Sequence, residues 1–80
     1  MKEIRVRGSL LRFVIAQESV LKENDHKNHW TGETLGYLSG RVADELGELR
    51  RAIKTKDPKK IKKEACDLAN FAMMIYDIAD

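Results

Sequence analysis

Two short acidic motifs in the second half of the chain could hold a cation between them. They read Glu45-Leu-Gly-Glu48 and Glu64-Ala-Cys-Asp67. Residues three apart on an α-helix lie on nearly the same face, so each motif can present two carboxylates to one ligand. If the two helices face each other, all four carboxylates converge on one point. Oxygen ligands of this kind suit Mg²⁺, with Mn²⁺ as a substitute.

The segment between the motifs predicts that two helices fold back on each other. It is rich in lysine and contains the only proline, in the pair Asp57-Pro58. Asp57 is a favourable N-cap, and Pro58 suits the first position of a helix. We expect one helix from about residue 33 or 34 to 54, and another from residue 58 to near the C-terminus. Along the first of these, apolar residues three and four apart form a stripe: Leu35, Leu38, Val42, Leu46, Leu49 and Ile53.

The acidic residues lie close to apolar surfaces of both helices. Helical geometry places Glu45 and Glu48 on one flank of the stripe, along the edge of a helix–helix contact. Glu64 falls within a very wide apolar sector of the last helix, and Asp67 lies beside Phe71. A carboxylate buried there must be protonated, paired or bound to a cation. A sector this wide also implies packing on two sides, one of which a partner chain would supply.

Two basic residues are candidates for phosphate contacts because of the faces they occupy. Arg41 lies one helical turn before Glu45 on the same flank. Lys60 lies one turn before Glu64, on the flank that carries Asp67. The other lysines around the turn are expected to form a solvated, charged end.

The N-terminal region predicts an extended arm followed by a helix. Apolar and basic residues alternate over residues 1–9, and nothing else in the chain offers a strand partner. Ser9 is expected to cap a helix over about residues 10–23. Gln17 falls inside the apolar stripe of this helix. It is either a tolerated polar residue at a partly wet contact or an amide that faces a ligand and reads a base edge.

The polar segment over residues 24–32 contains the only tryptophan and both histidines. Neither histidine has a zinc-like spacing to a cysteine. One interpretation is a solvated connection, with Trp30 packed as a lid on the core. The other is a recognition loop in which Trp30 stacks on a planar ring while His26 or Lys27 faces phosphate or base.

Size and composition restrict the class of protein. Eighty residues make a single domain, residues 1–80, and a chain of this length is marginally stable alone, which favours self-association. A net charge of +2 is too small for a nucleic-acid binder. The only cysteine, Cys66, leaves no internal disulfide and favours a reducing cytoplasm. No segment has the length and apolarity of a signal peptide or a membrane span.

The paired motifs resemble the MazG-like, all-α nucleoside triphosphate pyrophosphohydrolases. The ExxE motif, the connection over residues 49–63 and the ExxD motif carry the likeness, together with the segment Ala69-Asn-Phe-Ala-Met-Met74. The upstream Glu23-Asn-Asp-His-Lys-x-x-Trp30 looks like a subgroup associated with dATP/dGTP diphosphohydrolase domains. The likeness covers roughly residues 10–80.

The resemblance implies an all-α, three-helix protomer that assembles into a helical bundle as a homodimer or homotetramer. It implies Mg²⁺ bound by the four motif acids, and cleavage of a (deoxy)nucleoside triphosphate to monophosphate and pyrophosphate. Glu45 or Glu48 would be the general base of such a reaction, which could serve to clean the nucleotide pool. The rival interpretation is a non-catalytic helical interaction module, in which the acids form salt bridges across a dimer.

Overall fold

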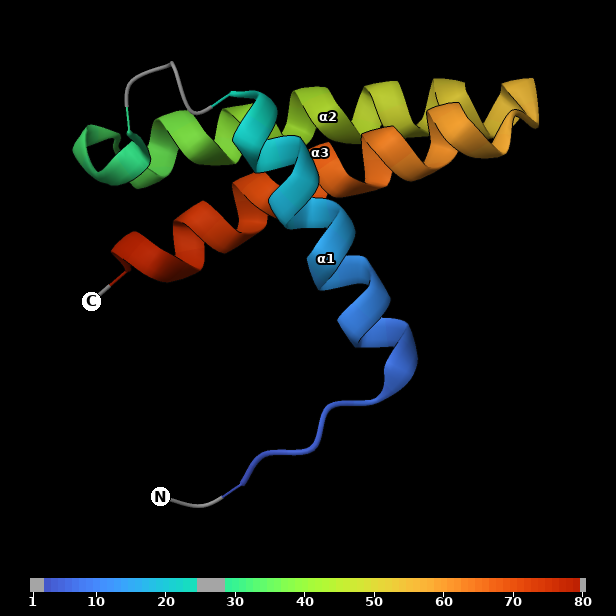
Figure 1. The fold of residues 1–80 in the computed structure, drawn as a ribbon. Helices are drawn as coiled ribbons and strands as arrows, with labels where there is room; N and C mark the ends of the chain where they lie inside the picture. Colours follow the sequence, from blue (N-terminus) through green and yellow to red (C-terminus); the bar gives the residue numbers. More distant parts are fainter. Residues whose placement is uncertain (1–2, 25–28, 80) are drawn as a thin grey trace.

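The computed structural model describes residues 3–24 and 29–79, and these residues form helices and no strand. The elements are α1 (Gly8–Glu23), the short 3-10 helix η1 (Trp30–Gly32), α2 (Leu35–Thr55) and α3 (Pro58–Ile78). The prediction of an all-α protein with three long helices is therefore confirmed. Figure 1 shows α2 and α3 side by side, with α1 crossing them and its N-terminal half running away from the pair.

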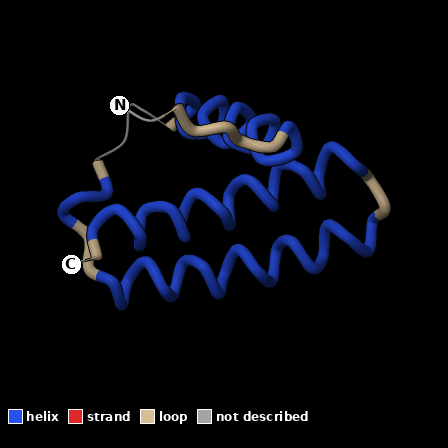
Figure 2. Tube along the Cα trace, turned by 90° about the horizontal axis from the view of Figure 1, so that it is seen from below, coloured by secondary structure: helices blue, strands red, loops and turns tan. Residues whose placement is uncertain are grey.

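A tight turn joins α2 to α3, as the sequence predicts. Lys56 adopts the left-handed conformation, with φ of 59°, and its N–H donates to the Ile53 carbonyl at 3.1 Å. The Asp57 carboxylate accepts from the backbone N–H of Lys59 at 3.0 Å, and Pro58 begins the helix. These contacts satisfy groups that helix ends otherwise leave unpaired. The result is an antiparallel hairpin of two long helices (Figure 2).

The first helix begins earlier than expected. It starts at Gly8 with Arg7 as N-cap, and no side chain caps it. The prediction of Ser9 as the cap is wrong, because the cap residue has extended backbone, as Arg7 does with ψ of 148°, whereas Ser9 is already helical. Residues 3–7 have no regular secondary structure and are exposed, in agreement with an arm. Among the described residues, α1 packs against α3 and not against α2.

The buried core of α2 coincides with only part of the predicted stripe. Leu38 is 1% exposed and Ala52 is 6% exposed, and Glu45 lies midway between them in sequence and is 5% exposed. This seven-residue spacing puts all three on the seam toward α3. Leu35, Leu46 and Ile53 belong to the same expected stripe, but about half of each remains exposed. The expectation that Glu45 lies at the edge of the contact is wrong: it lies at the centre.

Candidate metal centre

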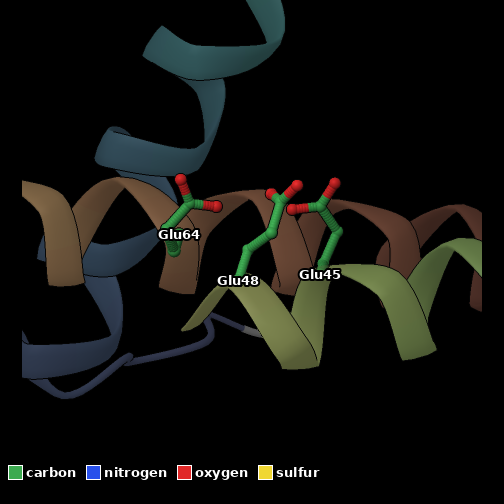
Figure 3. A group of neighbouring side chains, drawn as sticks. All are labelled: Glu45, Glu48 and Glu64. Atoms are coloured by element: carbon green, nitrogen blue, oxygen red, sulfur yellow. The ribbon is translucent and has the colours of Figure 1, made fainter. Parts of the chain in front are cut away.

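Three of the four predicted acids come together where α2 and α3 face each other. Glu45, Glu48 and Glu64 each place one carboxylate oxygen so that all three atoms lie within 4.8 Å of one another. Figure 3 shows two of these side chains on α2 and one on α3, all projecting to the same side of the hairpin. The three-residue spacing aligns Glu45 with Glu48, and the tight turn brings Glu64 opposite them.

The proximity of these carboxylates changes their proton affinities in different directions. Burial, followed by hydrogen bonding to Glu48 and repulsion from nearby acids, raises the pKa of Glu45 to about 7. Burial and a hydrogen bond to Glu48 also raise the pKa of Glu64. Hydrogen bonds to these two neighbours lower the pKa of Glu48. Burial and mutual repulsion thus favour the protonated form of Glu45 and Glu64, whereas hydrogen bonds from both neighbours favour the ionised form of Glu48.

Two oxygens of the cluster are buried without a hydrogen-bond partner among the described residues. They are Oε2 of Glu45 and Oε2 of Glu64. A buried carboxylate oxygen without a partner is costly, and a native structure seldom leaves one unexplained. A divalent cation would satisfy both atoms, and an all-oxygen donor set is the kind that Mg²⁺ or Mn²⁺ prefers. The residues present therefore fit the metal that the sequence suggests.

Asp67, the fourth predicted acid, is partly buried beside the cluster but is paired with a lysine. Its Oδ2 lies 2.8 Å from Nζ of Lys63, one helical turn earlier. Its charge nevertheless contributes to the raised pKa of Glu45 and of Glu64. The structure thus brings three acids to one point and leaves Asp67 as a neighbour with its own counter-ion.

A cavity of about 500 Å³ adjoins Glu45 and Asp67. Its walls combine three aromatic side chains with several charged groups, which suits a ligand that has a planar ring at one end and charge at the other. Its aromatic lining residues are Trp30, Tyr37 and Phe71. The other functional groups on the lining include Arg41, Lys63 and Asn70.

The position of Trp30 in this cavity is fixed by two neighbours. Its indole Nε1 donates to Oδ2 of Asp77 at 2.9 Å, and its ring stacks on His29 with centroids 4.0 Å apart. The Asp77 bond ties η1 to the end of α3. The structure thus places the ring of Trp30 on the wall of a cavity beside the acids. His26 and Lys27, predicted on the same segment, lie outside the described residues.

Arg41 links the first cavity to the acidic cluster of Glu45, Glu48 and Glu64. Its guanidinium donates to Asp44 at 2.9 Å and to Glu45 at 3.1 Å, and it lies over the ring of Phe71 at 5.1 Å from the centroid. Such contacts hold a planar guanidinium in one orientation. Lys60, the other predicted phosphate contact, is exposed and lines a second cavity together with Glu48 and Glu64.

Gln17 does not appear among the described residues that line either cavity. Its Nε2 donates to Oδ1 of Asn70 at 3.2 Å, and Nδ2 of Asn70 donates back to the Gln17 carbonyl at 3.3 Å. This reciprocal pair joins α1 to α3 across the edge of the first cavity. The amide therefore has a structural partner in place of the proposed ligand.

Sequence reasoning did not assign roles to Asn70, Tyr37, Phe71 or Arg51, each of which lines one of the two cavities. Asn70 could have been found, because it follows Asp67 by three residues and shares a helix face with it. A polar residue on such an apolar face signals a buried partner. Tyr37 and Arg51 gave no comparable signal, since both lie on the outer flanks of an amphipathic pattern.

No protein-family model, curated protein or solved structure matches the chain. Over the residues that the structure describes, no helix combines the length and apolarity needed to span a membrane.

Proposed function

We propose that this protein is a Mg²⁺-dependent nucleoside triphosphate pyrophosphohydrolase, which converts a (deoxy)nucleoside triphosphate to its monophosphate and pyrophosphate. The observation that carries the proposal is the convergence of Glu45, Glu48 and Glu64 within 4.8 Å, next to a cavity with aromatic walls. Two buried oxygens of this cluster without partners support a cation there. The MazG-like pattern of the acids supports the choice of reaction.

Glu45, Glu48 and Glu64 would hold the metal ion, and Asp67 is a fourth carboxylate within reach of its charge. When bound, Mg²⁺ would neutralise phosphate charge and lower the pKa of a coordinated water. Mn²⁺ takes the same oxygen ligands and would substitute for it. The chain's own contribution is to hold these carboxylates close together on two packed helices.

The first cavity would bind the nucleoside. The aromatic rings of Trp30, Tyr37 and Phe71 can stack on a base, and Arg41 and Lys63 carry charges suited to the phosphate beside it. Both cations now neutralise acids of the chain, so a phosphate would compete with Glu45 and Asp67 for them. His26 and Lys27 remain candidates for contact with base or phosphate from the neighbouring segment.

Glu45 is the better candidate for the general base, with Glu48 as the alternative. It lines the first cavity, and a carboxylate oxygen that does not bind the metal could accept the proton of a water there. In the proposed reaction the oxygen of a water attacks the α-phosphorus, and its proton passes to Glu45. The bond from the α-phosphorus to the bridging oxygen breaks, and pyrophosphate leaves with that oxygen.

The protein would act as a homodimer or homotetramer in the cytoplasm, on nucleotides and not on nucleic acid. Its exposed apolar side chains support self-association, because Leu35, Leu46 and Ile53 on α2 and Leu11 and Ile15 on α1 remain about half exposed or more. A helical bundle formed from two or more copies would cover them. Cys66 is free and buried, which agrees with a reducing compartment.

The test is pyrophosphate release from each dNTP and NTP, with and without Mg²⁺. We expect release with at least one nucleotide and no release in the presence of a chelator. Glu48→Gln should lower the rate of release by about 100-fold or more, because it removes one essential group. Glu18→Gln on the exposed surface of α1 is the matched control and should keep full activity. Absence of release with every nucleotide would overturn the proposal.

The exposed apolar side chains of α2, Leu35, Leu46 and Ile53, favour the alternative of a non-catalytic interaction module. The ion pairs of Arg41 and Lys63 lie within single helices and do not distinguish the two functions. Thermal melts separate the two functions, because a ligand that binds only the folded state raises its stability. A rise in Tm with Mg²⁺ that disappears in Glu64→Gln supports the enzyme. A melt that ignores the metal supports the module.

A further inference from the structure

A second cavity lies on the other side of the acidic cluster. It measures about 450 Å³ and is more open than the first. Its described lining residues are Glu48, Arg51, Ala52, Thr55, Lys60 and Glu64, and none of these is aromatic. Glu45 lines the first cavity, whereas Glu48 and Glu64 line the second. The candidate metal centre therefore stands between two spaces of different character.

The basic residues of the two cavities also differ. In the first, Arg41 and Lys63 are paired with carboxylates at 3.1 and 2.8 Å. In the second, neither Arg51 nor Lys60 forms an ion pair with a described residue. Two positive charges next to an acidic cluster, without partners of their own, are available to an anion.

Arg51 lines the second cavity beside Glu48. Its guanidinium extends back along α2 toward Gly47, one helical turn earlier, where a Cβ placed on the glycine would be 3.5 Å from one of its nitrogens. The charge of Arg51 is close enough to Glu48 to help lower the pKa of that carboxyl. Arg51 thus adjoins an acid of the centre without forming a close ion pair with it.

We propose that the second cavity is an anion subsite, in which Arg51 and Lys60 bind the terminal phosphates of the substrate and then the pyrophosphate that leaves. This inference rests on the proposed function, and it adds the orientation of the bound substrate across the site. The base would lie in the first cavity, where the aromatic rings are, and the α-phosphorus at the acids. The β- and γ-phosphates would lie in the second cavity, whose fork-shaped arginine and flexible lysine suit a multiply charged oxyanion.

The opposite orientation of the substrate, with its base in the second cavity, conflicts with the lining of the two cavities. A base in the second cavity would find no aromatic face among the described residues. Terminal phosphates in the first would lie against Glu33, Glu45 and Asp67, where Arg41 and Lys63 are already engaged. The described acids of the second cavity are Glu48 and Glu64, both of which would hold the metal ion. Like charges in contact disfavour binding, so charge and shape select the same orientation.

The direct test is calorimetric binding of two probes, magnesium pyrophosphate and a nucleoside monophosphate, to the full chain. The double variant Arg51→Gln/Lys60→Gln should bind pyrophosphate about tenfold more weakly or worse, since two charge-assisted contacts are lost, and should keep its affinity for the monophosphate. Trp30→Ala should bind the monophosphate more weakly and should keep its affinity for pyrophosphate. The matched control, Arg50→Gln/Lys62→Gln, removes two exposed charges that line neither cavity and should bind both probes as the wild type does.

A measurement on the wild type alone protects the test from a misfolded variant. If the subsites are separate, saturating magnesium pyrophosphate leaves the monophosphate able to bind. Mutually exclusive binding, or pyrophosphate affinity unchanged in the double variant, would overturn the inference even if triphosphates are hydrolysed. Pyrophosphate binding that depends on Arg51 and Lys60 would support it even if no nucleotide is hydrolysed, so its failure and that of the proposed reaction can be told apart.

Discussion

The α2–α3 hairpin contains every buried residue of the described chain, whereas α1 contains none. Leu38 and Ala52 on α2 and Cys66 on α3 are its buried apolar residues, and a capped turn closes the hairpin. In contrast, α1 touches α3 along one edge through partly buried residues such as Phe13 and Val20, and its opposite face is open. The same chain therefore has a well-packed part and a loosely attached part.

This difference separates the charged groups of the candidate site, which lie on the hairpin, from the part of the cavity wall that α1 supplies. All four motif acids and the four basic residues of the two cavities lie on the hairpin. The first helix contributes only Val20 and Leu21 to the wall of the first cavity, with Asn24 just beyond it. Rigid elements position catalytic groups better than mobile ones, and segments with few buried contacts open first. We expect α1 to control access to the first cavity while the acids stay in place.

The largest effect should come from the core of the hairpin. Leu38→Ala should lower the free energy of unfolding by about 2–5 kcal/mol, because it leaves a cavity at a fully buried site. Ile15→Ala on α1 removes a similar amount of side chain from a position that is 62% exposed, and should change stability by no more than about 0.5 kcal/mol. Urea unfolding at a concentration where the protein is monomeric gives both numbers.

An Ile15→Ala variant as unstable as Leu38→Ala would contradict the comparison. Its outer face would then be buried in solution, and sedimentation at several concentrations would show whether a second copy covers it.

The next largest effect should be a pH dependence of stability, which arises from carboxyl groups on the hairpin. Folding raises the pKa of Glu45 from 4.5 to about 7, so the folded state holds its proton more tightly than the unfolded state. Without metal, stability is therefore highest on the acid side and falls as pH rises from about 4.5 to about 7, in total by a few kcal/mol. Glu64, whose pKa is also raised, adds to this fall. The pKa of Glu48 is lowered, so its contribution to stability changes only below this pH window and is lost as the pH falls.

Glu45→Gln should flatten this profile, because it removes the group that titrates most strongly in the window. The measurement is urea unfolding at pH 5 and pH 8 in the presence of a chelator, with Glu18→Gln as the exposed control. A wild-type protein that becomes more stable between these two values would show that the carboxyls ionise freely. Mg²⁺ at pH 8 should restore the lost stability in the wild type and not in Glu45→Gln.

The local signals in the sequence were sufficient to predict the hairpin. The turn over residues 55–58 has its cap, Asp57, and its proline, Pro58, at adjacent positions, so both signals can be read from the sequence. The convergence of Glu45, Glu48 and Glu64 follows from that turn and from helical spacing. Contacts of this kind are local, and periodicity describes them well.

What the sequence could not predict is which part of a wide apolar face is buried within one chain. The stripe on α2 is broad enough to pack in several rotations, and α3 selects the line through Leu38 and Ala52, which moves Glu45 to the centre. The pairing of Lys63 with Asp67 was likewise unpredictable, because an acid three residues from Glu64 can face either the ion or a lysine one turn away. Such choices depend on the tertiary packing of three elements at once.

The smallest effect should come from the contact that joins the two parts. Gln17→Ala removes the 3.2 Å bond to Asn70 and leaves Oδ1 of a buried amide unpaired, at a cost of about 1 kcal/mol. Because α1 has no buried residue to hold it otherwise, much of that cost should appear as local opening. Amide hydrogen exchange should accelerate along α1 and stay unchanged at the centre of α2.

Glu18→Ala, at the next position but exposed, is the control and should leave exchange along α1 as it is. A double-mutant cycle with Asn70→Ala isolates the coupling between the two amides, which should account for most of the single-variant effect. If exchange in α2 accelerates equally, α1 and the hairpin open as one cooperative unit. In that case the first helix could not admit a nucleoside to its cavity without also loosening the acids.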